Sequence, residues 1–426
     1  MRTSHPAGPN RHLFKLALKN LSRSRFRTAV SIIAIAVGVI VVLISKSVVD
    51  GMIDDIVNSS VRLVSGHIRI LHEEYLAKER LLSLYYPVSG NEPGETVADL
   101  VRELEELPLV QTATARLRFS AMVSHDEELT GLMVVGVDPP KEEEATRLSR
   151  YLGQGRLPRS GERSAALGRE LLSKLGLSLG DHLTLVFTTS LGGLRAATFQ
   201  VVGEFASGLS FLDGALAYIP LDTAQELLHM EGAATEVIVM ATSMKHTRAA
   251  LAPIQSLLSA SSGGYQAYPY YDQSEYMRML MLSKGAFNLF YILLIILAAF
   301  VVSNTMVMIV NERKREIGMM AALGLAPGDI LRLFLYEGFI KGAAGAALGT
   351  AAGGVLVWIL SKYGILMGDV GVMDARLFVS PRIYPVFHGP LLFFAFLSGI
   401  VVTTIMTYLP ARRAARMDPA AAIRNL

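Results

Sequence analysis

Four long apolar segments constrain this chain more than any other feature of its sequence. A helix needs about 20 mostly apolar residues to cross the roughly 30 Å of hydrocarbon in a bilayer. Lys46, near the end of the first segment, and Glu337 and Lys341 in the third are the charged residues within them. We therefore predict four transmembrane helices, at residues 28–49, 285–310, 333–361 and 390–410.

The composition agrees with a membrane protein, because 51% of the residues are hydrophobic and only 18% are charged. A net charge of +3 is too small to indicate nucleic-acid binding. The sequence contains no cysteine, which excludes disulfides, thiol nucleophiles and thiolate metal sites. The first apolar segment is too long for a cleavable signal peptide, so we expect it to remain as an anchor.

The placement of basic residues predicts the orientation, since short cytoplasmic flanks are enriched in Lys and Arg. Residues 1–27 carry seven basic and no acidic residues, and both the connection 311–332 and the tail 411–426 are also rich in arginine. We expect both termini and this connection on the cytoplasmic side of the membrane. Residues 50–284 and the shorter loop 362–389 then lie outside the cytoplasm.

The N-terminal arm, residues 1–27, has the pattern of an amphipathic helix. The apolar face consists of Leu13, Leu16, Ala17 and Leu21. The basic face consists of Lys15, Lys19 and Arg23. A helix lying on anionic lipid and a plain basic flank both fit this pattern.

Residues 50–284 are long enough to form a folded extracytoplasmic domain. Its strand-like patterns lie at 66–71, 114–123, 131–137, 183–188, 198–202 and 236–240. Its helical patterns lie at 95–107, 168–175, 222–229 and 244–258. We predict a mixed α+β domain, with an α/β part into which a β-rich subdomain is inserted.

Two common catalytic motifs are missing. The Gly-Lys dipeptide of a phosphate-binding loop does not occur, and neither does a zinc-protease His pair. His67 begins a strand pattern, but a lone histidine is usually structural, and we assign it no chemistry. We expect no catalytic residue, no metal site and no cofactor in this chain.

The third apolar segment is dominated by glycine and alanine. Small residues allow helices to approach closely where lipid provides no hydrophobic drive for association. We therefore predict helix packing at Gly342, Gly345, Gly349 and Gly353. Glu337 and Lys341 are spaced i,i+4 near the cytoplasmic end of this segment, which predicts an ion pair on one helical face.

The connection 311–332, which we call the elbow, begins as a charged continuation of the second span. It carries Ile317, Met320 and Ala321 on one side, stops at Gly324 and restarts beyond Pro327. An apolar stripe flanked by charges is typical of a docking element for a partner, whereas a solvated interfacial loop would fit equally well.

Two groups of motifs resemble the FtsX-like permease family of ATP-binding-cassette transporters, in particular permeases of the lipoprotein-releasing LolC/LolE type. The first group is Arg315-Glu316-Ile317-Gly318, then Ala322-Leu323-Gly324, then Glu337-Gly338. The second lies in the C-terminal segment and consists of Pro410, Ala411, Ala414, Pro419, Ala422, Ile423 and Arg424. The resemblance covers both membrane halves and is weaker across residues 75–270.

This resemblance implies a non-catalytic membrane subunit whose partner ATPase dimer binds ATP and magnesium. The implied ATPase-coupling residues are Glu312, Arg313, Arg315, Glu316, Ile317, Met320, Leu323 and Gly324. The implied partners are a second permease subunit, membrane lipids, a lipoprotein cargo and a periplasmic carrier. A MacB-like efflux permease with an adaptor and outer-membrane channel remains an alternative, as does a signalling scaffold that activates a periplasmic hydrolase.

Overall fold

The computed structural model describes residues 9–23, 25–77, 82–125, 128–207, 210–259, 263–273, 275–366 and 382–417. These residues form two compact units. One is helical and contains the described residues within 9–53, 282–366 and 382–417. The other is an α/β unit that spans Asp54–Met281.

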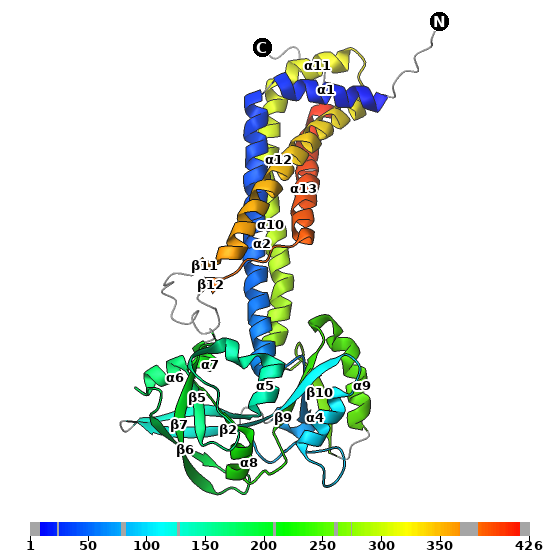
Figure 1. Ribbon diagram of the computed structural model, residues 1–426. Helices are drawn as coiled ribbons and strands as arrows, with labels where there is room; N and C mark the ends of the chain where they lie inside the picture. Colours follow the sequence, from blue (N-terminus) through cyan, green and yellow to red (C-terminus); the bar gives the residue numbers. More distant parts are fainter. Residues whose placement is uncertain are drawn as a thin grey trace. The chain divides into compact units, whose positions relative to one another are not determined.

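Four helices in the described residues are long and apolar enough to cross a membrane, as predicted. They are α2 (Arg25–Ser60), α10 (Glu275–Glu312), α12 (Pro327–Tyr363) and α13 (Gly389–Ala415). Each predicted span lies inside one of them. Two shorter helices, α1 (Pro9–Arg23) and α11 (Lys314–Ala322), lie near one another at one end of this bundle (Figure 1). Strands β11 (Ile365–Leu366) and β12 (Arg382–Ile383) form an antiparallel pair.

Glycines on α12 bring its backbone close to two neighbouring helices. A Cβ atom on Gly349 would lie 2.7 Å from the carbonyl oxygen of Ala36 on α2. Gly345 and Gly353 face α2 in the same way, whereas Gly342 faces Thr403 on α13. All four predicted packing glycines are buried between helices.

The α/β unit is built on one sheet of ten strands. The sheet order is β10-β1-β9-β2-β3-β8-β5-β7-β4, and β6 pairs with β2 and β7. The strands are β1 (Ile68–His72), β2 (Val110–His125), β3 (Glu128–Val137), β4 (Leu152–Gly155), β5 (Ser164–Gly168), β6 (His182–Thr188), β7 (Leu194–Phe205), β8 (Leu216–Pro220), β9 (Glu236–Ala241) and β10 (Tyr265–Pro269). The β3–β8 and β5–β7 pairs are parallel, and the other pairs are antiparallel.

Helices connect these strands and cover the sheet. They are α3 (Glu73–Ala77), α4 (Val97–Glu105), α5 (Pro139–Thr146), α6 (Arg169–Lys174), α7 (Ser210–Asp213), α8 (Leu221–Leu228) and α9 (Thr247–Ser259). Three single turns complete the unit: the π-helical turn η1 (Val61–Ser65), which directly follows α2, and the 3-10 turns η3 (Leu148–Tyr151) and η4 (Met244–His246).

Two main apolar cores form on this sheet, and Figure 1 shows the corresponding lobes. One core joins β2 and β3 to β5–β8, α6 and α8, with Phe119 and Phe199 at its centre. The other joins β1, β9 and β10 to α4 and α9, with Leu100 and Ile254 buried in it. The mixed α+β prediction is confirmed. The inserted segment β4–β8 supplies most of the first core, while its strands remain hydrogen-bonded in the common sheet.

Candidate functional site

The elbow is a separate short helix between two turns. Helix α10 ends at Glu312, and Arg313 leaves the helical conformation at φ −96° and ψ 14° before α11 begins. Gly324 has a φ of +91°, a conformation that glycine adopts without steric cost, and α12 starts with a proline in its first turn. The end at Gly324 and the restart at Pro327 follow the predicted pattern, whereas the break at Arg313 was not predicted.

The predicted docking stripe on α11 is covered by the chain itself. Ile317 is only 1% exposed and packs in a cluster with Met306 and Ile309 of α10, Phe334 of α12 and Ala411 of α13. Gly318 is buried, and Met320 and Ala321 are partly buried on the same side. Three helix ends of the same unit therefore cover this side, and the coupling role of Ile317 and Met320 stays a prediction.

The opposite side of α11 is free in the described structure. Arg315, Met319, Ala322 and Leu323 are exposed there, at i, i+4, i+7 and i+8 spacing, which places them on one helical face. Leu323 is 89% exposed and Met319 46%. Gly324 is exposed at the end of this face. We call the side chains of Arg315, Met319, Ala322 and Leu323 the α11 outer face.

The acidic residues of the elbow pair with arginines of the same unit. Glu316 lies 3.3 Å from Arg23 and accepts a hydrogen bond from Arg313 Nε at 2.8 Å. This hydrogen bond lowers the pKa of the Glu316 carboxyl. Glu312 pairs with Arg27 at the start of α2. Glu316 and Glu312 therefore link the elbow to α1 and α2, and Arg313 links it to Glu337 of α12. Their role in coupling to the ATPase stays a prediction.

The predicted pair between Glu337 and Lys341 is not formed within the described structure. Glu337 is 2% exposed and accepts hydrogen bonds from Asn20 Nδ2 at 2.9 Å and Arg313 Nη1 at 3.3 Å. Lys341 is also buried, with its Nζ 3.7 Å from the Met306 sulfur. The i,i+4 spacing does place both side chains on one face of α12, but that face turns inward, toward α1 and α10.

The N-terminal helix also packs on protein. Leu13, Ala17 and Leu21 are buried, and the Phe14 ring lies edge-on to Tyr336 of α12 with 5.7 Å between ring centroids. The predicted apolar face therefore binds the bundle rather than lipid, except for Leu16, which is 46% exposed. In the C-terminal motif, Pro410, Ala411 and Ala414 are buried on α13. Pro419, Ala422, Ile423 and Arg424 lie outside the described residues.

Two buried arginines hold the end of η1 in the α/β unit. Arg116 donates from Nη1 to the carbonyl oxygen of Leu63 at 2.8 Å, and Arg118 donates from Nη2 to that of Val64 at 2.5 Å. Arg116 also pairs with buried Glu142 at 2.5 Å. Sequence reasoning missed this clamp, although arginines two residues apart in a strand pattern must share one sheet face.

His67 is a structural histidine. Its Nδ1 accepts a hydrogen bond from the backbone N–H of Ala241 at 2.9 Å, and burial lowers its pKa. Across the described ranges, His, Asp and Glu side chains form no group of three that could hold a metal ion.

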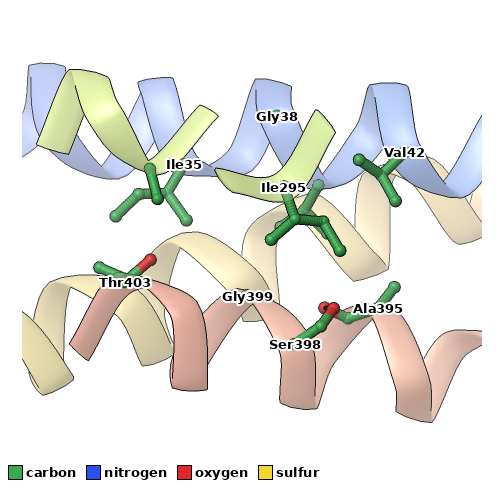
Figure 2. Close-up of a pocket in the computed structure, with 10 residues that line it drawn as sticks. Ile35, Gly38, Val42, Ile295, Ala395, Ser398, Gly399 and Thr403 are labelled. Carbon is green, nitrogen blue, oxygen red and sulfur yellow. Dashed lines mark hydrogen bonds between the residues drawn. The ribbon is translucent and has the colours of Figure 1, made fainter. Parts of the chain in front are cut away.

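A narrow apolar cavity lies between α2, α10 and α13 of the helical unit. Its volume is about 20 Å³, and Figure 2 shows Ile35, Val42 and Ile295 on its walls with Ser398 and Thr403 on the α13 side. This is room for about one water molecule. In this packing the three helices therefore enclose no space for a larger ligand.

Two protein-family descriptions match this chain. Residues 28–257 match the MacB-like periplasmic core domain, and residues 288–419 match the FtsX-like permease C-terminal domain.

Individual relatives match at low identity. The lipoprotein-releasing system transmembrane protein LolC of Xylella fastidiosa is 24% identical over 413 residues, which cover 94% of each chain. The corresponding LolE protein of Haemophilus influenzae is 22% identical over 410 residues, or 92% of each chain. The macrolide export protein MacB of Chromobacterium violaceum is 26% identical over 206 residues, which cover 47% of this chain and 29% of that protein.

Proposed function

Because the chain belongs to the FtsX-like permease family with a MacB-like periplasmic core domain, we propose that it couples ATP hydrolysis in a partner to the release of lipoproteins. It is a multi-pass inner-membrane permease subunit of an ABC transporter. In the proposed system, a separate ATPase dimer drives this chain and a second permease subunit. A periplasmic carrier receives the released lipoprotein.

The observation that carries this proposal is the extent of the match. The relation to the LolC protein runs over 94% of both chains, so the membrane helices and the outer domain match together and in the same order. The match to the MacB exporter covers 29% of that protein. Efflux with an adaptor and channel therefore remains the second candidate.

The α11 outer face is the proposed contact with the ATPase. Arg315 supplies a positive charge, and Met319 and Leu323 supply exposed apolar surface next to it. Exposed apolar side chains beside an arginine are typical of the centre of a protein interface. Since the other side of α11 is packed against α10, α12 and α13, a displacement of this helix would be passed directly to three helices.

Lipoprotein release requires an energy source. Each methylene group of an acyl chain that leaves the membrane costs about 0.8 kcal/mol. The cavity between α2, α10 and α13 holds about one water molecule, so these helices would have to separate to receive an acyl chain. We propose that ATP-driven movement of α11 opens this part of the bundle.

The experiment is reconstitution of the chain with its co-purified ATPase in vesicles that contain an acylated protein. We expect the acylated protein to move to a soluble carrier only when ATP is present. A version of the same protein without acyl chains should reach the carrier without ATP. If ATP is hydrolysed in response to an exported small molecule while the acylated protein stays in the membrane, the efflux function replaces this one. If ATP turnover instead activates a cell-wall hydrolase without transfer of cargo, the signalling function replaces lipoprotein release.

The role of the α11 outer face is tested with the double variant Arg315→Glu, Leu323→Ala. We expect it to insert normally, to lose most of the bound ATPase and to lose ATP-driven transfer. The matched control is Arg412→Glu, a charge reversal at an exposed arginine of α13 outside this face. Unchanged recovery of ATPase with the double variant would reject α11 as the contact.

The proposed orientation is open to a simple labelling test because the chain has no native cysteine. We expect Leu191→Cys, in the exposed turn between β6 and β7, to react with a membrane-impermeant maleimide in intact spheroplasts. Leu323→Cys should react only after the membrane is opened. Reaction of both positions from the same side would reject the topology, and with it the coupling mechanism.

A further inference from the structure

A second, polar cavity lies entirely within the α/β unit. Its volume is about 240 Å³, and its wall includes Asn58, Arg62, His67, Gln111, Glu144 and Arg147. These residues come from the end of α2, η1, the start of β1, the edge of β2 and the C-terminal end of α5. None of them belongs to the α11 outer face or to the cavity of the helical unit. We call this space the Arg62–Arg147 cavity.

The cavity carries two arginines that the rest of the fold does not use. Unlike Arg69, Arg116 and Arg118, which all pair with buried glutamates, neither Arg62 nor Arg147 forms a carboxylate ion pair in the part of the chain described here. Glu144 is the acidic residue in the lining. Two guanidinium groups and one carboxylate leave this wall with a net positive charge.

The uncharged groups of the wall add hydrogen-bond donors. Because His67 Nδ1 accepts the Ala241 N–H, the neutral ring carries its proton on Nε2, which is then a donor. The side-chain amides of Asn58 and Gln111 supply N–H groups as well. The lining is therefore richer in donors than in acceptors, which suits an anion with several oxygen atoms.

The backbone at Arg147 is unusual for an arginine. This residue ends α5 with φ 55° and ψ 49°, a left-handed conformation that costs a residue with a Cβ atom about 1–2 kcal/mol. Glycine is the usual residue at this position of a helix end. Strained residues of this kind cluster at binding sites, where the side chain has a role that offsets the strain.

We propose that the Arg62–Arg147 cavity binds a small phosphate-bearing anion, of the size of inorganic phosphate or a lipid headgroup. The guanidinium groups of Arg62 and Arg147 hold the phosphate oxygens, as their planar paired donors match that geometry. The volume is about twelve times that of the one-water cavity between α2, α10 and α13, which is enough for phosphate with a short substituent. Glu144 is placed to accept an amine on that substituent.

The test uses the full-length chain in maltoside micelles, which contain no phosphate. Equilibrium dialysis with radiolabelled inorganic phosphate should show saturable binding to one site per chain. Arg147→Gly removes the guanidinium and also relieves the left-handed strain, so it should fold at least as well as the parent. We expect it to raise the dissociation constant for phosphate about tenfold or more.

His229→Gly is the matched control, because His229 also ends a helix in the left-handed conformation, at φ 58°, and does not line the cavity. It should gain the same relief of strain and bind phosphate like the parent. Competition by glycerophosphoethanolamine identifies the source of the anion. Stronger competition than by phosphate indicates a lipid headgroup, weaker competition indicates free phosphate, and either result supports the site.

Two results would overturn the proposal. One is the absence of saturable phosphate binding to the parent chain. The other is equal binding by the parent and by Arg147→Gly at equal melting temperature. In either case Arg62 and Arg147 would serve only to offset the negative ends of the two helices on which they lie.

Discussion

The guanidinium of Arg313 donates a hydrogen bond to the buried carboxylate of Glu337 at 3.3 Å, across 24 residues of sequence. Arg313 is the residue at which the helical path breaks between α10 and α11, and Glu337 lies on α12. The same carboxylate oxygen accepts from Asn20 on α1. One buried acid on α12 therefore holds both α12 and α1 to the elbow.

Glu337→Gln should destabilise the elbow. The substitution keeps the shape of the side chain but removes the buried charge that Arg313 Nη1 contacts, while Glu316 still pairs with Arg313 Nε. Weakening this charged hydrogen bond should cost about 1.5–3 kcal/mol. We expect a melting temperature several degrees lower in detergent. Asp329→Asn breaks the exposed pair with Arg332 instead and should cost about 0.5 kcal/mol or less. Equal effects of the two variants would contradict the buried linkage.

Ile317→Ala and Leu323→Ala should separate packing from docking on the same helix. Ile317 is buried in the cluster beneath α11, so its truncation should cost about 2–4 kcal/mol of stability. Leu323 is exposed, and its truncation should leave thermal unfolding unchanged within about 0.5 kcal/mol while weakening the proposed ATPase contact. Melting curves and ATPase co-purification give the two readouts. Loss of stability in Leu323→Ala would show that this side chain is packed.

The position of the elbow could be predicted from sequence, whereas its free side could not. The restart of the helix at Pro327 and the turn at Gly324 are local signals. Ile317 and Leu323 have similar character, and which of them faces solvent depends on Met306, Phe334 and Ala411, which come from three other helices. Contacts of that kind leave no local pattern.

The outer domain shows the same limit in its strands. Strands with alternating or β-branched residues, such as β6 and β9, could be predicted. Strands β5 and β8 were not predicted. Like β9 they are buried at every residue and so show no period of two, but unlike β9 they contain few β-branched residues. The helical unit gives a further example. The Glu337–Lys341 pair was predicted from spacing alone, but Glu337 instead accepts a hydrogen bond from Asn20, 317 residues away in the sequence.

Gly349→Val should disrupt the packing of α12 on α2. The added side chain would meet the Ala36 carbonyl oxygen at 2.7 Å and the Val39 Cβ at 2.8 Å, and backbone atoms cannot move aside locally. We expect a loss of about 2 kcal/mol or more from overpacking. Gly285→Ala in α10, where a Cβ atom meets nothing within 4 Å, should instead stabilise by about 0.5–1 kcal/mol. Thermal melting in detergent distinguishes the two, and tolerance of Gly349→Val would mean that the helices do not pack this closely.

The pairing of Glu236 with Arg69 and Arg118 should make the outer domain sensitive to acid. Burial alone would raise the pKa of this carboxyl, but the charges of Arg118, Arg69 and Arg116 hold it below its ordinary 4.5. Its ionised form therefore stabilises the fold fully above about pH 5, and the contribution is lost as the pH falls through 4.5 toward the lower folded value. Melting temperatures of the full chain between pH 7 and pH 3 should show this loss. At pH 7 the free energy of unfolding of Glu236→Gln should be about 3–5 kcal/mol lower than that of the parent, because buried arginine charge is left unpaired. This free energy should then fall less with acid than that of the parent. If the variant lost as much stability between pH 5 and pH 3 as the parent, other carboxylates would be responsible for the acid sensitivity.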